Sequence, residues 1–233
     1  MIKIFPASSR YHGNLGWLNS YMSFSFAHYH DPETPSFGPL RVLNDDFVEP
    51  GKGFGMHPHK NMEIVSIVLD GHLQHTDSTG HSAISTFGGV QRMTAGTGIV
   101  HSEMNQGDNV VNFLQLWFDP EQQNLEPSYQ VTQYDPEQMK NALLPVVAKA
   151  STDSKVCSIR QDITIYLSDL EADRSISYDS LNNRRTFLFV IEGALVMNDL
   201  HHLETRDSAR ITDVSSLQFK ALKDTRFMLI DLP

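Results

Sequence analysis

Short apolar or alternating runs, separated by turn signals, dominate the pattern along the chain. Residues 63–69 (EIVSIVL) and 112–118 (NFLQLWF) are two such runs in the first half. Turn-forming pairs such as Pro50-Gly51, Asp70-Gly71 and Gly88-Gly89 interrupt the runs at short intervals. This spacing is typical of the strands of a β-sandwich or barrel, and sustained 3.6-residue periodicity is scarce. The pattern therefore predicts an all-β protein.

One segment in the middle of the chain departs from this pattern. Asp135 is a suitable helix N-cap, Pro136 suits the first helical position, and Gln138 completes a pattern like a capping box. We expect a helix from Asp135 to about Val146. The strand pattern then resumes at residues 163–167, 175–181, 186–191 and 225–232.

A weak internal repeat relates the two β-regions. Residues 68–71 (VLDG) are echoed by 190–193 (VIEG), and in each case an apolar strand enters an acidic-glycine turn. A looser echo relates 91–94 (QRMT) to 209–212 (ARIT). The two offsets, 122 and 118 residues, agree within a small deletion. The repeat predicts two similar β-units.

The length of 233 residues is enough for two domains with cores of their own. Combining the repeat with the expected helix gives three parts. We predict an N-terminal β-barrel at residues 1–133, a short helical linker at 134–150, and a C-terminal β-barrel at 151–233.

Composition and charge narrow the class of protein. The net charge of -10, with no lysine or arginine cluster, argues against direct binding of nucleic acid, which requires a basic surface. Cys157 is the single cysteine, so no intrachain disulfide forms, which fits a reducing compartment. The longest apolar stretch, residues 186–197, contains Glu192 and is too short to span a bilayer. The start of the sequence has no apolar run typical of a signal peptide. We expect a cytoplasmic protein without membrane contact.

Two pairs of residues with metal-ligand chemistry lie in the first β-region. His57 and His59 stand near the start of a strand, and His101 and Glu103 follow a glycine-rich turn. Side chains at i and i+2 of a strand share one face, so each pair can point into a barrel interior. Three imidazoles and one carboxylate suit Fe(II), Mn, Co, Ni or Cu with positions left for substrate, and imidazole suits Zn as well. The sequence predicts a metal site on these four residues.

The other histidines are expected to have different roles. His28 and His30 form another H-x-H pair, but they precede Asp31-Pro32 and should lie in a polar loop with a structural or surface role. Three more fall around a turn and are expected to be solvated or hydrogen-bonded: His72, His75 and His81.

Two segments around the predicted site resemble the motifs of the cupin superfamily. Residues 51–71 read G-x5-H-x-H-x3-E-x7-G, with one residue more before the last glycine than the first cupin motif. Residues 98–105 read G-x2-H-x3-N, like the end of the second motif. Gly96 and Val90 stand where that motif usually has proline and glycine. In many cupins the glutamate of the first motif, here Glu63, is the fourth ligand.

Further segments, spread over roughly residues 15–120, carry a longer resemblance: 53–59 (GFGMHPH), 75–80 (HTDSTG), 93–103 (MTAGTGIVHSE), 17–18 (WL), 24–26 (FSF) and 40–46 (LRVLNDD). These segments resemble the pirin family. In pirins the carboxylate ligand corresponds to Glu103, which leaves Glu63 as a structural group beside the site. The resemblance implies a bicupin, two face-to-face β-barrels (double-stranded β-helix) with the metal in the N-terminal barrel.

The C-terminal barrel is expected to lack a metal. Moving His57, His59 and Glu63 forward by the first offset reaches Asp179, Leu181 and Arg185, and no histidine follows His202. Pirins also have a metal-free second barrel. We therefore expect one divalent transition metal ion per chain, with Fe first and Mn, Co, Ni, Cu or Zn as alternatives.

Bacterial pirins are associated with quercetin 2,3-dioxygenase activity. The resemblance implies an oxidoreductase that opens the flavonol ring of quercetin-like substrates with O2 and releases carbon monoxide. Glu103 would be the catalytic base for the 3-hydroxyl proton. Phe54, Met56 and Met104 are candidates for an apolar substrate pocket, and ordinary barrel packing is the alternative for them.

A second reading comes from eukaryotic pirins, which are associated with transcriptional coregulation. It implies a metal-dependent interaction protein whose metal redox state tunes the binding of a protein partner. A structural barrel that retains a metal motif is a third reading. Oxygen uptake on addition of quercetin separates the first two.

Overall fold

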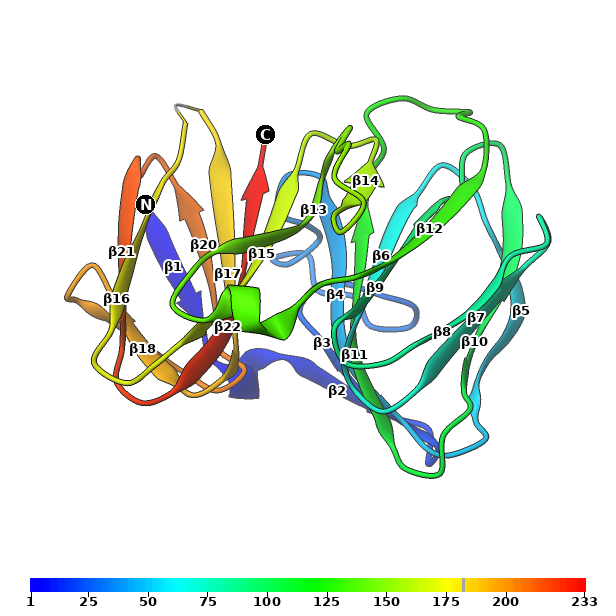
Figure 1. The fold of residues 1–233 in the computed structure, drawn as a ribbon, viewed down its shortest axis with the longest axis horizontal. Helices are drawn as coiled ribbons and strands as arrows, with labels where there is room; N and C mark the ends of the chain where they lie inside the picture. The colour runs from blue at the N-terminus through cyan, green and yellow to red at the C-terminus, as the bar shows by residue number, and fades with distance from the viewer. Residues whose placement is uncertain (182) are drawn as a thin grey trace. The chain divides into compact units, whose positions relative to one another are not determined.

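The structure is a computed structural model, and it describes residues 1–181 and 183–233. Four sheets built from antiparallel strand pairs make up nearly all of its regular structure (Figure 1), which confirms the all-β prediction. The helical elements within the described ranges are two short 3-10 helices, η1 (Ala7–Ser9) and η2 (Pro136–Met139). No helix among the described residues is long and apolar enough to cross a membrane.

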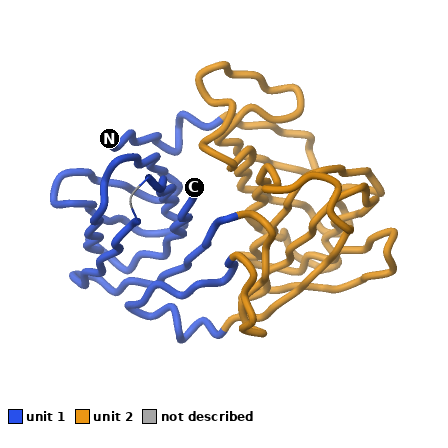
Figure 2. The backbone as a smooth tube through the Cα atoms, turned by 90° about the horizontal axis from the view of Figure 1, so that it is seen from above, with its two compact units in different colours: residues 1–10, 135–148, 162–233 blue, residues 11–134, 149–161 orange. Residues whose placement is uncertain are grey.

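The chain divides into two compact units, which Figure 2 shows in different colours. Unit 1 comprises residues 1–10, 135–148 and 162–233, and unit 2 comprises residues 11–134 and 149–161. Each unit therefore combines segments that are far apart in the sequence. Residues 1–10 belong to the unit that contains the C-terminal half, and residues 151–161 belong to the unit that contains the N-terminal half.

Strand pairing and side-chain contacts explain both exchanges. The first ten residues contain β1 (Ile2–Phe5), which pairs with β20 (Ser208–Thr212) within unit 1. Residues 149–161 contain β14 (Cys157–Ile159). In unit 2 the Cys157 thiol lies 3.3 Å from the Thr132 hydroxyl, and the Ser158 amide donates to the Gln130 side chain at 2.8 Å. Strands that pair are usually close together in the sequence. The pairing of β1 with β20 joins distant segments, so no local sequence pattern predicts it.

Unit 2 contains a large and a small antiparallel sheet. The large sheet has the order β12 (Ser128–Gln133), β9 (Gly89–Thr94), β6 (Glu63–Asp70), β11 (Val111–Phe118), β4 (Leu40–Val48), β3 (Leu18–Met22), β2 (Tyr11–Asn14). The small sheet has the order β5 (Gly53–His59), β10 (Ile99–Asn105), β7 (Leu73–Asp77), β8 (Ser82–Ser85).

Burial along the strands of unit 2 follows their place in these sheets. The first six residues of β6 are all buried, as expected for a strand covered on both faces. Strand β10 alternates instead, with residues 99, 101, 103 and 105 buried. One apolar cluster packs Val68 and Leu73 against Val111 and Phe113. The alternation in β10 places His101 and Glu103 on the same inward face.

Unit 1 repeats the arrangement of a large and a small sheet. The strands of the large sheet that belong to unit 1 run in the order β1, β20, β17 (Arg185–Glu192), β22 (Thr225–Leu232), β15 (Thr164–Leu170), β13 (Leu144–Lys149). The small sheet runs β16 (Ser175–Asp179), β21 (Ser216–Ala221), β18 (Ala194–Met197), β19 (His201–Glu204). Its core is an apolar cluster that includes Leu188, Val190, Leu195, Phe219 and Phe227.

The register of the strands confirms the internal repeat. In unit 2 Val65 of β6 faces Arg92 of β9, and in unit 1 Phe187 of β17 faces Arg210 of β20. Phe187 follows Val65 by 122 residues and Arg210 follows Arg92 by 118 residues, which are the offsets of the two sequence echoes. The strand β6 is followed by Gly71 at φ 82°, and β17 by Gly193 at φ 98°. A Cβ on either glycine would lie under 3 Å from a backbone atom of the neighbouring strand, so both turns need glycine.

The predicted helical linker is wrong. Asp135 does act as an N-cap, because its side chain accepts a hydrogen bond from the Glu137 amide at 3.1 Å, but the helix is only the single turn η2. Asn141 has φ 51°, and β13 begins at Leu144. The extended backbone at Lys140 and the left-handed Asn141 end the turn, and Pro145 disfavours a helical conformation at Leu144, so a helix could not continue to Val146.

Candidate metal centre

Neighbouring strands of the small sheet in unit 2 bring three histidines together. His57 and His59 lie two residues apart in β5, and His101 lies in the adjacent strand β10. His101 pairs directly with His57, and Ile99 pairs with His59. Because side chains two residues apart share a face and paired residues lie side by side, the three imidazoles converge on one face of the sheet.

The imidazole nitrogens are close enough to share one ion. A ligand atom from each of the three residues lies within 4.8 Å of the others. The ring centroids of His57 are 4.8 Å from His59 and 4.5 Å from His101, and those of His59 and His101 are 4.9 Å apart. This proximity is the one that the sequence predicted for these residues.

The hydrogen bonds of the imidazoles leave lone pairs without a protein partner. Nδ1 of His57 donates to the carbonyl of Gly55 at 2.7 Å, which leaves Nε2 of His57 as the basic nitrogen. Nε2 of His59 and Nε2 of His101 are buried, and neither has a hydrogen-bond partner among the described residues. Three buried or half-buried imidazole lone pairs gathered in this way fit a divalent transition metal, for which imidazole is a common ligand.

Burial keeps His59 and His101 in the neutral form that a metal requires. It lowers the pKa of His59 to about 4 and, more strongly, the pKa of His101 to about 2. Charge on the neighbouring imidazoles lowers both values further, because a second proton in the cluster would be repelled. His59 and His101 are therefore unprotonated near neutral pH without any ion to displace their protons.

Glu103 is buried beside the histidines, but its carboxylate is not a member of the three-residue group. Its Oε1 accepts a hydrogen bond from the Ser66 hydroxyl at 2.8 Å, and its Oε2 accepts one from the Gln115 amide at 2.5 Å. Each carboxylate oxygen has a further lone pair, so these bonds leave Glu103 able to accept a proton or to bind an ion. Burial raises the pKa of Glu103, although the bond from Ser66 acts in the opposite direction.

A cavity of about 280 Å³ opens onto the imidazole cluster. This volume is close to the lower end of the range for small-molecule sites, about 300–1,000 Å³. Its wall contains the three histidines and Glu103. The remaining lining residues are apolar on one hand (Leu18, Met22, Phe26, Phe54, Trp117) and polar on the other (Ser20, Asn44, Asp46, Gln115).

Of the three predicted pocket residues, Phe54 lines this cavity, while Met56 and Met104 are not among its lining residues. Met56 is 57% exposed because it alternates with His57 along β5. Met104 likewise alternates with Glu103 in β10. Phe54 reaches the cavity face through a β-bulge, since two residues of β5 oppose one of β10 between the pairs His57–His101 and Phe54–Glu103.

Several lining residues were missed in the sequence, most notably Trp117, Gln115 and Asp46. The ring of Trp117 meets that of His59 edge-on, with centroids 4.7 Å apart. A signal for one of them was present, because Gln115 interrupts the otherwise apolar run of residues 113–118. Polar residues at buried strand positions often mark a binding site.

The structure also places Glu63 and the five histidines for which the sequence predicted roles other than metal binding. Glu63 is fully buried and accepts a hydrogen bond from Thr94 at 3.0 Å, away from the imidazole group. His28 and His30 are exposed, and His28 lies 3.2 Å from the Tyr11 hydroxyl. Of the three histidines around the turn, His72 and His81 are exposed, whereas His75 is buried and hydrogen-bonded.

Unit 1 has an apolar interior where unit 2 has its imidazoles. Asp179 and Leu181, the positions that correspond to His57 and His59, are both exposed. Among the described residues, the group of His57, His59 and His101 is the one cluster of three or more metal-binding side chains. One ion per chain remains the prediction, and elemental analysis measures it.

Asp46 has an unusual environment in the cavity wall. It is buried, it pairs with Ser20 across β3 and β4, and its Oδ1 has no hydrogen-bond partner among the described residues. Burial raises the pKa of Asp46 to about 7, and the charges of Asp45 and Glu103 contribute to the increase. The carboxyl group therefore exchanges its proton near neutral pH.

We expect Asp46→Asn to become more stable relative to the unmodified protein as pH rises. Between about pH 4 and about pH 7 the folded protein keeps the Asp46 proton while the unfolded chain loses it, so the contribution of Asp46 to stability falls with pH. A pKa raised from 3.8 to about 7 corresponds to as much as ~4 kcal/mol over this range. Urea unfolding of both metal-free proteins at about pH 4 and about pH 8 measures the difference. The exposed Asp108→Asn is the control, and an equal pH dependence of both variants would contradict the assignment.

Two family models match the chain. The pirin model matches residues 6–118, and the model described as the quercetinase C-terminal cupin domain matches residues 146–232. These matches cover parts of both halves of the chain and agree with the two β-units of the structure.

Proteins similar along the whole chain are also known. The quercetin 2,3-dioxygenase of Escherichia coli (strain K12) is 37% identical over 234 residues, which cover 100% of this chain and 99% of that protein. A pirin-like protein of Caulobacter vibrioides is 33% identical over 216 residues, with 93% of each chain covered.

Solved structures of Escherichia coli YhhW share the fold throughout. One crystal structure has a TM-score of 0.95 at 36% identity and covers 100% of this chain and 98% of that one. The complex of the bacterial pirin YhhW with nickel(II) has a TM-score of 0.94 at 35% identity, with coverage of 100% and 99%. With two cupin-type units, an imidazole cluster in one of them and full-length relatives of this similarity, the chain belongs to the pirin family.

Proposed function

We propose that this protein is a metal-dependent dioxygenase that opens the flavonol ring of quercetin-like substrates with O2. The observation that carries the proposal is the convergence of three imidazoles on a cavity with apolar and aromatic walls. The full-length relative named quercetin 2,3-dioxygenase supports the same activity. We propose one divalent transition metal ion per chain, held by His57, His59 and His101 with Glu103 as the fourth ligand. Fe is the first candidate, and the nickel complex of YhhW makes Ni the next metal to test.

The cavity wall offers complementary surfaces for a flat, hydroxylated aromatic molecule. Phe26 and Trp117 meet edge-on with centroids 5.2 Å apart, and Phe54 lies near His57 with centroids 6.5 Å apart. Aromatic side chains of this kind bury aromatic ligands favourably. Asn44 and Asp46 would bind hydroxyl groups, since each has a buried side-chain oxygen without a partner among the described residues.

The protein's own groups would manage the proton of the reaction. Glu103 accepts the proton of the flavonol 3-hydroxyl, and the bonds from Ser66 and Gln115 hold its carboxylate in place for that transfer. A divalent metal ion held by His57, His59, His101 and Glu103 would supply Lewis acidity toward the flavonolate and a redox centre for the reaction with O2 that opens the ring and releases carbon monoxide. The apolar part of the wall limits the access of water to the substrate.

The proposal is tested by oxygen uptake on addition of quercetin. Protein stripped of metal is reloaded in turn with Fe, Mn, Co, Ni, Cu or Zn, and loss of quercetin, O2 consumption and carbon monoxide are followed together. We expect equal consumption of quercetin and O2 with at least one metal and none in the stripped protein. If no metal supports oxidation of any flavonol, the dioxygenase proposal fails and the metal-dependent interaction protein takes its place.

A pair of substitutions on β5 tests the position of the substrate. Phe54→Ala should raise the KM for quercetin about 2- to 10-fold, because an aromatic contact contributes about 0.5–1.5 kcal/mol beyond area burial. Met56→Ala should leave KM unchanged, since Met56 is exposed on the other face of the strand. Metal content should be unchanged in both variants. Equal KM values for both variants would show that the substrate does not contact this wall.

A further inference from the structure

A buried histidine and a buried aspartate lie directly behind the imidazole cluster. His75 and Asp77 are in β7, which pairs with β10, so that Asp77 is opposite His101 and His75 is opposite Glu103. Both side chains are buried on the same inward face. Neither takes part in the chemistry proposed above, and burial of two ionisable groups requires an explanation.

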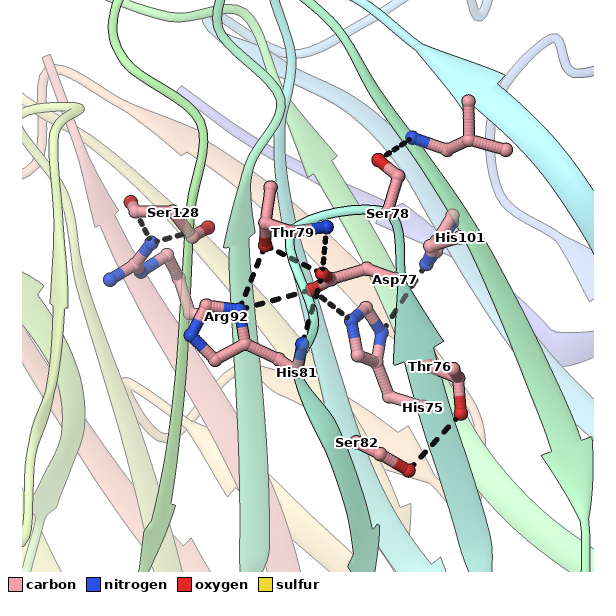
Figure 3. Close-up of polar contacts among 11 residues, drawn as sticks. His75, Thr76, Asp77, Ser78, Thr79, His81, Ser82, Arg92, His101 and Ser128 are labelled. Atoms are coloured by element: carbon pink, nitrogen blue, oxygen red, sulfur yellow. Dashed lines mark hydrogen bonds and ion pairs between the residues drawn. The ribbon is translucent and has the colours of Figure 1, made fainter.

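The two residues form a chain of hydrogen bonds that ends on His101 (Figure 3). Nε2 of His75 lies 2.9 Å from Oδ2 of Asp77, and Nδ1 of His75 lies 3.4 Å from Nδ1 of His101. The far nitrogen of His101, Nε2, is the buried atom without a hydrogen-bond partner among the described residues. The chain therefore runs from a carboxylate through two imidazoles to a proposed metal ligand.

Other contacts fix both ends of the His75–Asp77 pair. Oδ1 of Asp77 accepts hydrogen bonds from the Thr79 amide at 2.8 Å, the Thr79 hydroxyl at 2.6 Å and the His81 amide at 3.3 Å. These donors occupy Oδ1, while Oδ2 faces Nε2 of His75 at 2.9 Å and lies 3.5 Å from Nδ1 of His81. The ring of Tyr129 stacks on His75 with centroids 4.0 Å apart and an angle of 10° between the planes. The stack holds the plane of the His75 ring.

The direction of each hydrogen bond follows from this arrangement. A carboxylate only accepts, so a neutral His75 carries its proton on Nε2 and presents a lone pair at Nδ1. His101 must then donate from Nδ1, which leaves the lone pair of His101 on Nε2, facing the cluster. The opposite arrangement would place the lone pair of His75 Nε2 against the carboxylate of Asp77.

We propose that Asp77 and His75 are positioning residues that fix His101 in the tautomer and orientation in which Nε2 binds the metal. The proposal rests on the metal site of the proposed function and deepens it. Partners behind a metal-binding histidine fix its tautomer, and their loss typically weakens metal binding about 10- to 100-fold. Here the partner of the ligand is a second imidazole rather than the carboxylate itself.

Asp77→Asn is the decisive substitution, because its geometry predicts a reversal of the proton chain. The three donors at Oδ1 require the amide oxygen at that position, so the NH2 group replaces Oδ2 and faces His75. The amide then donates to Nε2 of His75, His75 carries its proton on Nδ1, and His101 must move its own proton to Nε2. The lone pair needed by the metal is lost in that tautomer.

Imidazole ¹⁵N NMR of the metal-free protein reads these tautomers without any activity assay. In the unmodified protein we expect the Nε2–H tautomer for His75 and the Nδ1–H tautomer for His101. In Asp77→Asn we expect both assignments to reverse. An Nε2–H tautomer of His101 in the unmodified protein would overturn the proposal, and this measurement stands even if the variant fails to fold.

Titration with Ni²⁺ in a chelator-buffered solution gives the second measurement. We expect the Kd for Ni²⁺ to rise about 10- to 100-fold in Asp77→Asn. Thr76→Val is the matched control, because Thr76 lies between the two residues on the outward face of β7 and bonds to Ser82. Its Kd should equal that of the unmodified protein. A Kd in Asp77→Asn equal to that of the control would overturn the proposal.

The results separate this proposal from the proposed function. Ni²⁺ binding that depends on Asp77, in a protein that oxidises no flavonol, would refute the dioxygenase activity and support the role of the His75–Asp77 pair. Flavonol oxidation with unchanged tautomers and an unchanged Kd for Ni²⁺ in Asp77→Asn would support the dioxygenase activity and refute the role of the His75–Asp77 pair.

Discussion

His101→Ala should abolish most metal binding, lowering the affinity by at least about 100-fold, the upper end of the loss caused by removing a residue behind a ligand. His101 supplies one of three imidazoles whose ligand atoms lie within 4.8 Å of one another, and its Nε2 is buried without another partner among the described residues. His57→Ala should have the same effect, because an incomplete set of ligands remains. Elemental analysis of protein purified without an affinity tag measures the loss, with one ion per chain expected before substitution.

His28→Ala is the control for this experiment. It removes a histidine from the other H-x-H pair, which is exposed, and should leave the metal in place. Loss of the metal in His28→Ala would contradict the assignment of the metal to His57 and His59. Two tightly bound ions per unmodified chain would contradict a metal-free unit 1.

Glu103→Gln should lower flavonol oxidation about 10²- to 10⁴-fold while a fraction of the metal remains bound. The substitution removes the proposed base, but the three imidazoles can still hold a divalent ion. The structure also accommodates the amide. Its oxygen can accept the bond from Gln115, and its NH2 group can donate to the Ser66 hydroxyl, which is able to accept. Loss of turnover would therefore report the loss of the base and not of the fold.

Glu63→Gln is the comparison, since Glu63 is a buried glutamate that bonds to Thr94 and lies outside the imidazole group. Its effect on turnover should be milder. Quercetin loss and O2 consumption are compared at equal metal occupancy, so that differences in binding do not enter. Near-normal turnover in Glu103→Gln would show that another group takes the proton, and Asp46 would be the next to test because it also lines the cavity.

The sequence by itself determined the features that depend on local periodicity. The two-residue spacing of His57 and His59, and of His101 and Glu103, fixed which side chains share a face once the segments were strands. The repeated acidic-glycine turns marked equivalent positions of two β-units, because the close approach of a neighbouring strand excludes a Cβ at Gly71 and Gly193. The resemblance to pirins then selected Glu103 over Glu63 as the candidate ligand.

Only the tertiary structure decided features that depend on pairing between distant segments. The pairing of β1 with β20 assigns the first ten residues to unit 1, and no local signal marks it. A bulge in β5 turns Phe54 toward the cavity, while alternation turns Met56 away from it. In the sequence His75 is one of three histidines around a turn, whereas the register of β7 against β10 places it behind His101. Sequence spacing sets the face of a strand on which a side chain lies, but the partner that it meets there depends on sheet order and register, which long-range packing decides.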